Sequence, residues 1–306
     1  MTSRSAVTVS EEQMASLHSG VEICFQTFGD PSDPPILLVM GLSGPMGWWD
    51  AGFCRDLAAG GHFVIRFDNR DVGRSTRFRE HKVTRLDVVR AFLGLGKGPY
   101  TLDDLADDAF GVLDHLGLEQ AHVVGVSMGG MIVQTMAIAR PERVLSMTSI
   151  MSTTGRRTVG FQSPKVIPGL LESIGDTREE YIAASLRTAT RIASPEYPTT
   201  EEVSRARAEE TWDRGPAGSG VLRQMLAILT QPDRTKALGR LEMPVTVVHG
   251  LADPLVHRSG GRATARAIPG ARHLEIPGMA HDLPQQLHAT FIEAITDCVA
   301  RGEARR

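Results

Sequence analysis

A serine between two glycines is the first feature of the sequence that could do chemistry. Residues 125–129 read Gly-Val-Ser-Met-Gly and match the pattern G-x-S-x-G. They lie between an apolar run that predicts a strand over 121–126 and a segment with helical periodicity over 128–139. A sharp turn at such a junction exposes the serine Oγ above the carboxyl edge of a sheet, and glycines avoid collisions in that turn. The pattern therefore predicts that Ser127 is a nucleophile.

A serine hydroxyl needs a base that accepts its proton, and the base needs a third group that fixes its tautomer. Asp253 follows a predicted strand over 245–249, and His281 lies in the loop after the next predicted strand. Because parallel strands end at the same edge of a sheet, this order predicts a triad of Ser127, His281 and Asp253. Two other acids compete for the third role. Asp282 is expected to face away from the site, and Asp233 lies in a helical region.

Acyl transfer also needs N–H donors that stabilise the oxyanion of the tetrahedral intermediate. The backbone N–H of Met128, directly after the nucleophile, is the first expected donor. The second is expected from the glycine-containing loop after the predicted strand over 36–40, where we choose the N–H of Leu42. Packing of the following helix explains the two tryptophans near this loop as well as a pocket role does. The candidates for the substrate pocket are Gly41, Trp48 and Trp49.

The sequence gives little support to metal or cofactor chemistry. The patterns HExxH, HxH and CxxC are absent, and Cys24, Cys54 and Cys298 are widely spaced, which argues against a zinc site and a disulfide framework. Four aspartates between 103 and 108 resemble a metal site, but acids in the first turns of a helix also favour its dipole. We therefore expect no metal and no cofactor.

The strands and helices that must position these residues alternate along the chain. This alternation predicts an α/β fold with a mostly parallel sheet covered by helices on both faces. The first two strands are expected to be antiparallel. The expected strands cover 6–9, 21–28, 36–40, 62–67, 121–126, 144–150, 245–249 and 273–276, and the expected helices cover 49–59, 101–116, 128–139 and 286–299.

The pattern changes between residues 154 and 241. Strand-like runs disappear, and amphipathic helices are expected over 179–193, 200–213 and 221–230, separated by Ser-Pro and Gly-rich joints. We interpret 154–241 as a helical cap inserted into a core formed by 1–153 and 242–306.

Composition narrows the class of protein. The chain has 306 residues, and 33 Lys and Arg against 36 Asp and Glu give a net charge of −3, which argues against a nucleic-acid partner. No apolar run approaches the ~18 residues of a membrane span, so stable membrane insertion is not expected. The start, MTSRSAVTVSEEQ, lacks the basic and apolar regions of a secretory signal, which favours a cytoplasmic location.

In the order of these motifs the chain resembles the α/β-hydrolase superfamily over nearly its whole length. The resemblance rests on 40–42, on the segment 68–75, on the turn around Ser127, and on the loops of Asp253 and His281. Segments 38–41, 69–71, 122–125 and 276–279 resemble the esterase and lipase branch that includes the aclacinomycin methylesterases. The resemblance implies an eight-stranded sheet and a helical lid. Many relatives have His-Gly where this chain has Met40 and Gly41, which removes one side-chain hydrogen bond but leaves the backbone donor.

The expected function is a serine carboxylic-ester hydrolase acting through an acyl-enzyme on a small to medium, partly apolar ester. Carboxylesterase, methylesterase and lipase activities all fit this description. A cofactor-free haloperoxidase or perhydrolase, which uses the same triad with peroxide, stays open because sequence hardly separates the two. A ligand receptor without turnover is a third interpretation, and the intact Ser127, Asp253 and His281 count against it.

Overall fold

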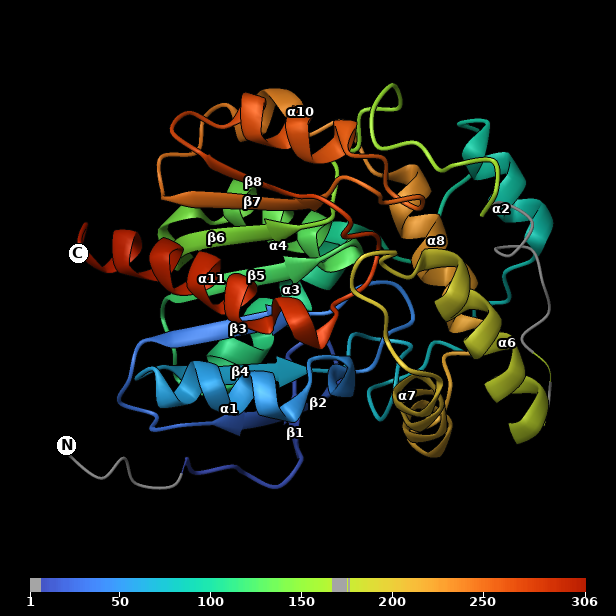
Figure 1. Cartoon of the computed structure of the whole chain (residues 1–306), viewed down its shortest axis with the longest axis horizontal. Coiled ribbons are helices and arrows are strands. Elements are labelled where there is room, and N and C mark those ends of the chain that lie inside the picture. Colours follow the sequence, from blue (N-terminus) through green and yellow to red (C-terminus); the bar gives the residue numbers. More distant parts are fainter. Residues whose placement is uncertain (1–6, 167–174, 176) are drawn as a thin grey trace.

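The computed structural model describes residues 7–166, 175 and 177–306 (Figure 1). In this part of the chain eight strands form one sheet in the order β1-β2-β4-β3-β5-β6-β7-β8. β1 and β2 are antiparallel to their neighbours, and the pairs from β4 to β8 are parallel. The expected α/β sheet is confirmed. Its strands are β1 (Gln13–Ser16), β2 (Glu22–Phe28), β3 (Pro35–Val39), β4 (Phe63–Phe67), β5 (Ala121–Val126), β6 (Val144–Ile150), β7 (Val245–Gly250) and β8 (Arg272–Ile276).

The sheet is buried on both faces because its central strands are apolar on both sides. In β3, Ile36 and Leu38 pack into one hydrophobic cluster, while Leu37 and Val39 pack into the cluster on the opposite face. Figure 1 shows α1 and α11 in front of the sheet and α3 and α4 behind it. The helices outside the segment between β6 and β7 are α1 (Ala51–Ala59), α2 (Arg85–Phe92), α3 (Leu102–His115), α4 (Met128–Ala139), α10 (Ser259–Ala267) and α11 (His288–Glu303).

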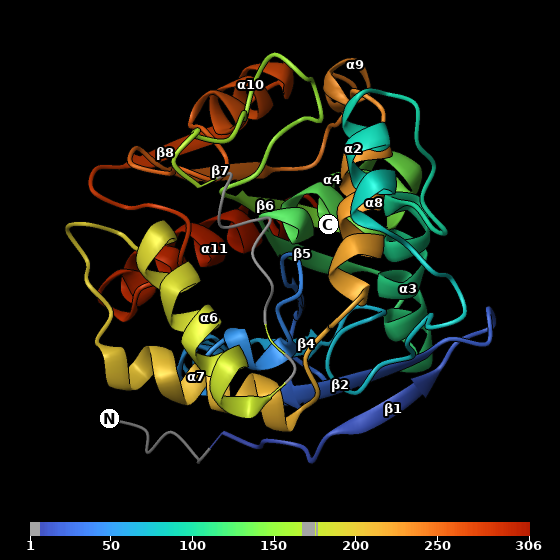
Figure 2. The same ribbon diagram turned by 90° about the vertical axis from the view of Figure 1, so that its right-hand side faces the viewer.

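Four described helices lie between β6 and β7, where the sequence predicts an insertion. They are α6 (Arg178–Ile192), α7 (Glu201–Asp213), α8 (Gly220–Thr230) and α9 (Thr235–Leu238). The first three lie within one or two residues of the expected ranges, and we call them the cap helices. Figure 2 shows α6 and α7 on one side and α8 beside α2 on the other, whereas α9 packs against α4 and α10. The cap boundaries at 154 and 241 stay a prediction.

The first strand differs from the expectation. Of the expected strand over 6–9, Ala6 lies outside the described residues, and Val9 forms only an isolated bridge with Phe28. The strand that pairs with β2 is β1, where Ala15 is the one buried residue and the apolar signal is correspondingly weak. A tight turn with Gly20 at φ 79° joins β1 to β2 and sets their register.

Asp103 and Asp104 lie in the first turn of α3 as expected, but one other aspartate of the acidic run has a different role. Thr101 caps the helix as predicted, because its Oγ accepts the Asp104 N–H and its own N–H donates to the Asp104 carboxylate. Asp108, however, is buried and forms an ion pair with Arg70 at 2.6 Å. Its contribution is therefore a specific pair with the segment after β4 rather than a general interaction with the helix dipole.

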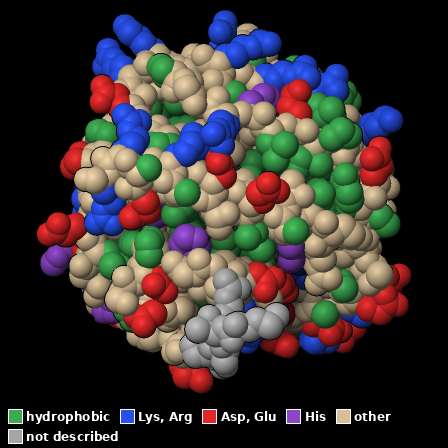
Figure 3. Space-filling model, turned by 60° about the vertical axis from the view of Figure 1, so that its left-hand side comes forward, with side chains coloured by type: hydrophobic (Ala, Val, Ile, Leu, Met, Phe, Trp, Pro, Cys, Tyr) green, Lys and Arg blue, Asp and Glu red, His purple; other side chains and the backbone are tan. Residues whose placement is uncertain are grey.

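Charged side chains of both signs are interspersed on the face of the molecule that Figure 3 shows. Lys and Arg side chains gather along the upper edge of that view, where α10 lies in Figure 1. Among the described helices, none combines the length and the apolar character that crossing a bilayer requires.

Buried histidines should make the fold sensitive to acid. Burial lowers the pKa of the fully buried His122 and His249, and of the partly buried His62 and His288. Below the unfolded pKa of about 6.5, the unfolded chain binds protons that the folded chain does not, so stability falls as pH decreases. We expect the free energy of unfolding in urea to be lower at pH 5.5 than at pH 7.5, by at most about 1.4 kcal/mol per histidine. An unchanged or higher value at pH 5.5 would contradict this expectation.

Candidate active site

Ser127 lies at the junction of β5 and α4 in a strained backbone conformation. Its φ of 56° and ψ of −116° fall in a region that residues other than glycine rarely adopt, at a cost of about 1–3 kcal/mol. Hydrogen bonds on both sides hold it there. The Ser127 N–H donates to Ile150 O at 2.9 Å, and Ser152 Oγ donates to Ser127 O at 2.8 Å. The turn that the sequence predicts is therefore present and firmly fixed.

The glycines on either side of Ser127 are required by close backbone packing. A Cβ on Gly125 would lie 2.1 Å from Gly129 O, and a Cβ on Gly129 would lie 2.1 Å from Val39 O. These distances are far shorter than any real contact. The start of α4 can therefore approach β3 and β5 only because both positions lack a side chain.

The structure brings the three residues of the predicted triad together. His281 Nε2 lies 2.9 Å from Ser127 Oγ, and His281 Nδ1 lies 2.8 Å from Asp253 Oδ2. Asp253 and His281 are buried, whereas Ser127 is only half-buried. The side chain of Asp253 is fixed through its other oxygen, because Oδ1 accepts the N–H groups of Leu255 and Val256, each at 2.8 Å.

This arrangement dictates which nitrogen of His281 carries the proton. An ionised carboxylate can only accept hydrogen bonds, so the Nδ1 beside Asp253 is the protonated one. The lone pair on Nε2 then faces the hydroxyl of Ser127. In this geometry the imidazole can take the serine proton at the moment when Oγ attacks an electrophile.

His249 is part of the site although its position in a strand suggests only a packing role. Its Nε2 donates to Val256 O at 2.8 Å and lies 3.6 Å from Asp253 Oδ2. The side chain is completely buried, and burial lowers its pKa, which keeps the imidazole neutral. It therefore ties the loop of Asp253 to β7. The four-residue spacing to Asp253 is the only signal in the sequence that hints at this contact.

The side chains of the two competing acids form hydrogen bonds to residues outside the triad. Asp282 accepts a hydrogen bond from Ser194 Oγ, and burial raises its pKa. Asp233 accepts the N–H of Thr235 in the turn before α9. Ser194 also accepts the N–H of Ala280 at 2.8 Å, so the segment after α6 holds the loop of His281 in place.

The loop after β3 lies against the nucleophile, as the prediction of an oxyanion donor requires. A Cβ on Gly41 would lie 3.1 Å from Ser127 Cβ. The Gly44 N–H donates to Gly41 O at 3.3 Å and closes a tight turn in which Ser43 has φ 59°. Met128 is the first residue of α4, where N–H groups have no partner within the helix. The assignment of Leu42 and Met128 N–H as oxyanion donors stays a prediction.

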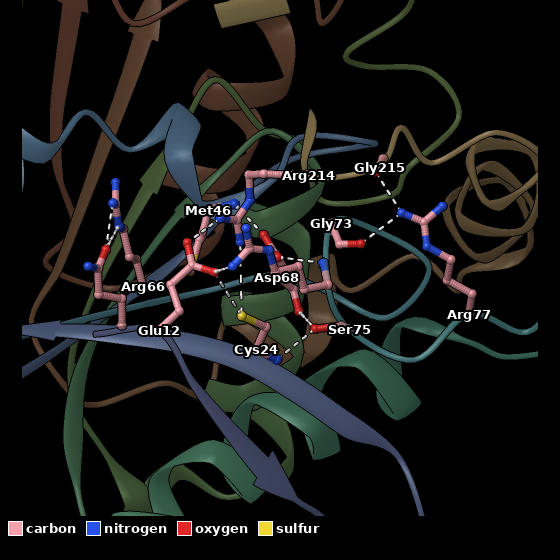
Figure 4. A network of polar contacts seen from close by, with 12 residues as sticks. Glu12, Cys24, Met46, Arg66, Asp68, Gly73, Ser75, Arg77, Arg214 and Gly215 are labelled. Carbon is pink, nitrogen blue, oxygen red and sulfur yellow. Dashed lines mark hydrogen bonds and ion pairs between the residues drawn. The ribbon is translucent and has the colours of Figure 1, made fainter. Parts of the chain in front are cut away.

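The segment after β4, residues 68–75, was one of the motifs that resemble the family. Two of its side chains hold the loop after β3 at both ends. Asn69 Nδ2 donates to Met40 O at 3.0 Å, and Asp68 Oδ1 accepts the N–H of Met46 at 2.7 Å. Figure 4 shows that the same carboxylate pairs with Arg214, at the end of α7, at 2.7 Å. Cys24 lies in this network, and burial raises the pKa of its thiol to about 12, so very little reactive thiolate forms near neutral pH.

The contacts of the two tryptophans are with residues outside the triad. Trp48 Nε1 donates to Thr211 Oγ1 of α7 at 3.0 Å, and Trp49 is buried and stacked on Phe53. Both line a cavity of about 210 Å³ between α1, α7 and α11 whose lining does not include Ser127. The packing explanation fits Trp49. Gly41 is the pocket candidate that lies beside the nucleophile.

Comparison with known proteins identifies the family. The family model described as the alpha/beta hydrolase fold matches residues 34–284. The chain belongs to the alpha/beta hydrolase fold family. This α/β hydrolase is 32% identical over 298 residues to rhodomycin D methylesterase DauP from Streptomyces sp. (strain C5), with 90% of this chain and 94% of the relative covered. It is also 32% identical over 301 residues to rhodomycin D methylesterase DnrP from Streptomyces peucetius, with the same coverage.

Solved structures agree on the fold. The enol-lactonase from Burkholderia xenovorans LB400 superposes with a TM-score of 0.73 at 23% identity, covering 94% of this chain and all of the other. At this level of identity the likeness shows the fold of the α/β hydrolase alone. The family and fold expected from the sequence are confirmed.

Proposed function

We propose that this α/β hydrolase is a serine carboxylic-ester hydrolase in which Ser127 is the nucleophile, His281 the general base and acid, and Asp253 the residue that orients His281. The observation that carries the proposal is the hydrogen-bonded chain from Asp253 Oδ2 through both ring nitrogens of His281 to Ser127 Oγ. The ester-hydrolase class itself is confirmed by the two methylesterase relatives. The individual roles are our assignment.

The reaction follows from this geometry in two balanced halves. Ser127 Oγ attacks the ester carbonyl carbon while His281 Nε2 takes the hydroxyl proton, and the oxyanion faces the N–H groups of Leu42 and Met128. When the bond to the alkoxy group breaks, His281 gives this proton to the departing alcohol. Water then attacks the acyl-enzyme, His281 takes one of its protons, and the proton returns to Ser127 as the acid leaves.

For the substrate we propose a small to medium, partly apolar ester. The cap helices present apolar residues toward the rest of the molecule, and Ile182 and Leu226 among them are buried. The match to this chain covers 94% of each of two relatives that are named rhodomycin D methylesterases. A methyl ester of a polyketide-like molecule is therefore the narrower proposal. A cytoplasmic location belongs to the same proposal. Neither the perhydrolase nor the receptor interpretation is favoured by a specific contact in the site.

A panel of esters tests this proposal. We expect the purified chain to hydrolyse p-nitrophenyl esters of short and medium acyl length faster than the palmitate, and to cleave methyl esters of aromatic acids. Initial rates at 405 nm and release of methanol measure the two reactions. Release of an unchanged ligand without turnover would favour a receptor. Turnover that requires added peroxide would favour a perhydrolase.

A further inference from the structure

Gln224 is a fully buried polar residue that connects a cap helix to the loop beside the nucleophile. It lies on α8, and its side chain has no exposed surface. Its Oε1 accepts the N–H of Ser43 at 2.8 Å, and its Nε2 donates to Arg70 O at 2.9 Å. Because buried amides are costly unless they are hydrogen-bonded, both contacts matter for keeping this side chain in place.

The contact with Ser43 holds the peptide group that follows the one carrying the Leu42 N–H. Asn69 holds Met40 O on one side of the peptide that carries the Leu42 N–H, and Gln224 holds the Ser43 N–H on the other. The carbonyl of the peptide itself, Gly41 O, accepts the Gly44 N–H. In a planar trans peptide the N–H points away from the C=O, so these contacts together determine where the Leu42 N–H points.

Ser43 also needs an external partner for its conformation. Its φ of 59° is left-handed, which serine adopts only when its surroundings enforce it. Gln224 supplies this partner, because its Oε1 accepts the Ser43 N–H in the observed turn. Without it, the turn loses one of the contacts that compensate for the strain.

The position of Gln224 is in turn set by a buried ion pair on the same helix. Arg223 binds both carboxylate oxygens of Asp71, at 2.7 and 2.8 Å, and Tyr100 donates to Asp71 at 2.8 Å. Arg223 and Asp71 are buried, and Arg223 holds the pKa of Asp71 below its usual range against the opposing effect of burial. The next residue on α8 is therefore held at a defined distance from the loop.

We propose that Gln224 is a positioning residue through which docking of the cap forms the oxyanion hole. The proposal rests on the proposed function, since it assigns the Leu42 N–H to the oxyanion. A displaced α8 would release the Ser43 N–H, so the site would be fully competent only when this helix is seated on the core. Gln224 acts through the backbone and does not touch the reacting atoms.

Replacing Gln224 with methionine tests the role, because methionine keeps the volume and removes both hydrogen bonds. Loss of a whole oxyanion donor costs about 10²–10³ in kcat, and for a misplaced donor we expect a loss of about ten- to hundredfold, with KM changed by less than about threefold. Affinity for phenylboronic acid, which forms a tetrahedral adduct on the serine, should fall in parallel. Gln224→Glu keeps the acceptor for Ser43 and should retain more activity than Gln224→Met.

Gln134→Met is the matched control. Gln134 is equally buried and hydrogen-bonded to Ser149 and Arg234, but it lies on α4 away from the oxyanion loop. The Gln134→Met variant should lower the melting temperature about as much as Gln224→Met does, while its kcat stays close to that of the wild type. If both variants lower kcat equally, the effect of Gln224 is general destabilisation and the proposal is wrong.

Hydrogen exchange separates failure of this inference from failure of the proposed function. In Gln224→Met the amide of Ser43 should exchange at least tenfold faster than in the wild type, in a measurement that needs no substrate. Faster exchange with unchanged kcat on p-nitrophenyl esters would overturn the positioning role and leave the ester hydrolase intact. Unchanged exchange would overturn it as well. Absence of turnover in the wild type would refute the function instead.

Discussion

Ser127→Ala is expected to lower kcat for ester hydrolysis by about 10⁶-fold, the scale of loss when a serine protease loses its nucleophile. The reason is that the alanine methyl group cannot form the acyl-enzyme, while His281 and Asp253 keep their places. Binding of the ester should change little, because the oxyanion donors and the rest of the site remain. Stopped-flow and long-time rate measurements on p-nitrophenyl acetate cover the required range.

Ser146→Ala is a suitable control for this variant. Ser146 is a buried serine of β6 whose Oγ contacts His122 Nδ1 at 2.8 Å, away from the carboxyl edge of the sheet. Its replacement should leave kcat within about twofold of the wild type, since the hydrogen bond that it removes is to His122 and not to the triad. Substantial turnover by Ser127→Ala at a purity that excludes wild-type enzyme would show that another group is the nucleophile.

Asp253→Asn is expected to lower kcat by about 10⁴-fold while the fold stays intact, as for the corresponding change in a serine protease. The carbonyl oxygen of the asparagine can still accept the N–H groups of Leu255 and Val256, which leaves the NH₂ group facing His281. An NH₂ donor stabilises the tautomer with an unprotonated Nδ1. The proton then resides on Nε2, which can no longer accept the proton of Ser127.

The two acids that compete in the sequence serve as controls for Asp253. Asp233→Asn changes an exposed residue in a turn, and Asp282→Asn changes a contact with Ser194 outside the triad. We expect both variants to retain kcat within about tenfold, a range that indirect effects on positioning can reach. If Asp282→Asn were the variant with the 10⁴-fold loss, the assignment of the acid would pass to Asp282.

The sequence predicts the parts of the site that depend on local patterns. Strand and helix periodicity placed Ser127, Asp253 and His281 directly after three predicted strands, β5, β7 and β8, and parallel pairing brings the ends of these strands to one edge of the sheet. The order of the motifs along the chain decided the assignment of the triad, because each residue by itself has an ordinary structural explanation. The fold could be predicted because strand and helix periodicity is also a local pattern.

The contacts that support the site were beyond the reach of the sequence because they join distant segments. Gln224 reaches Ser43 across 181 positions, and Arg214 reaches Asp68 across 146. On an amphipathic helix such residues look like any polar residue, and only the docking of α7 and α8 reveals their partners. The prediction of the first strand was wrong because β propensity favours Val9 over the residues of β1. In the structure the turn at Gly20 decides which segment pairs with β2.

The cap also affects how the chain folds as it is made. β6 and β7 are neighbours in the sheet, but the inserted segment separates Ile150 from Val245. At about 5–20 residues per second, the ribosome needs roughly 5–20 s to synthesise the intervening stretch of about ninety residues. During that time β6 is an edge strand without its partner, and exposed strand edges pair readily with other chains. Nascent chains of this protein therefore pass through an aggregation-sensitive stage that ends only when β7 arrives.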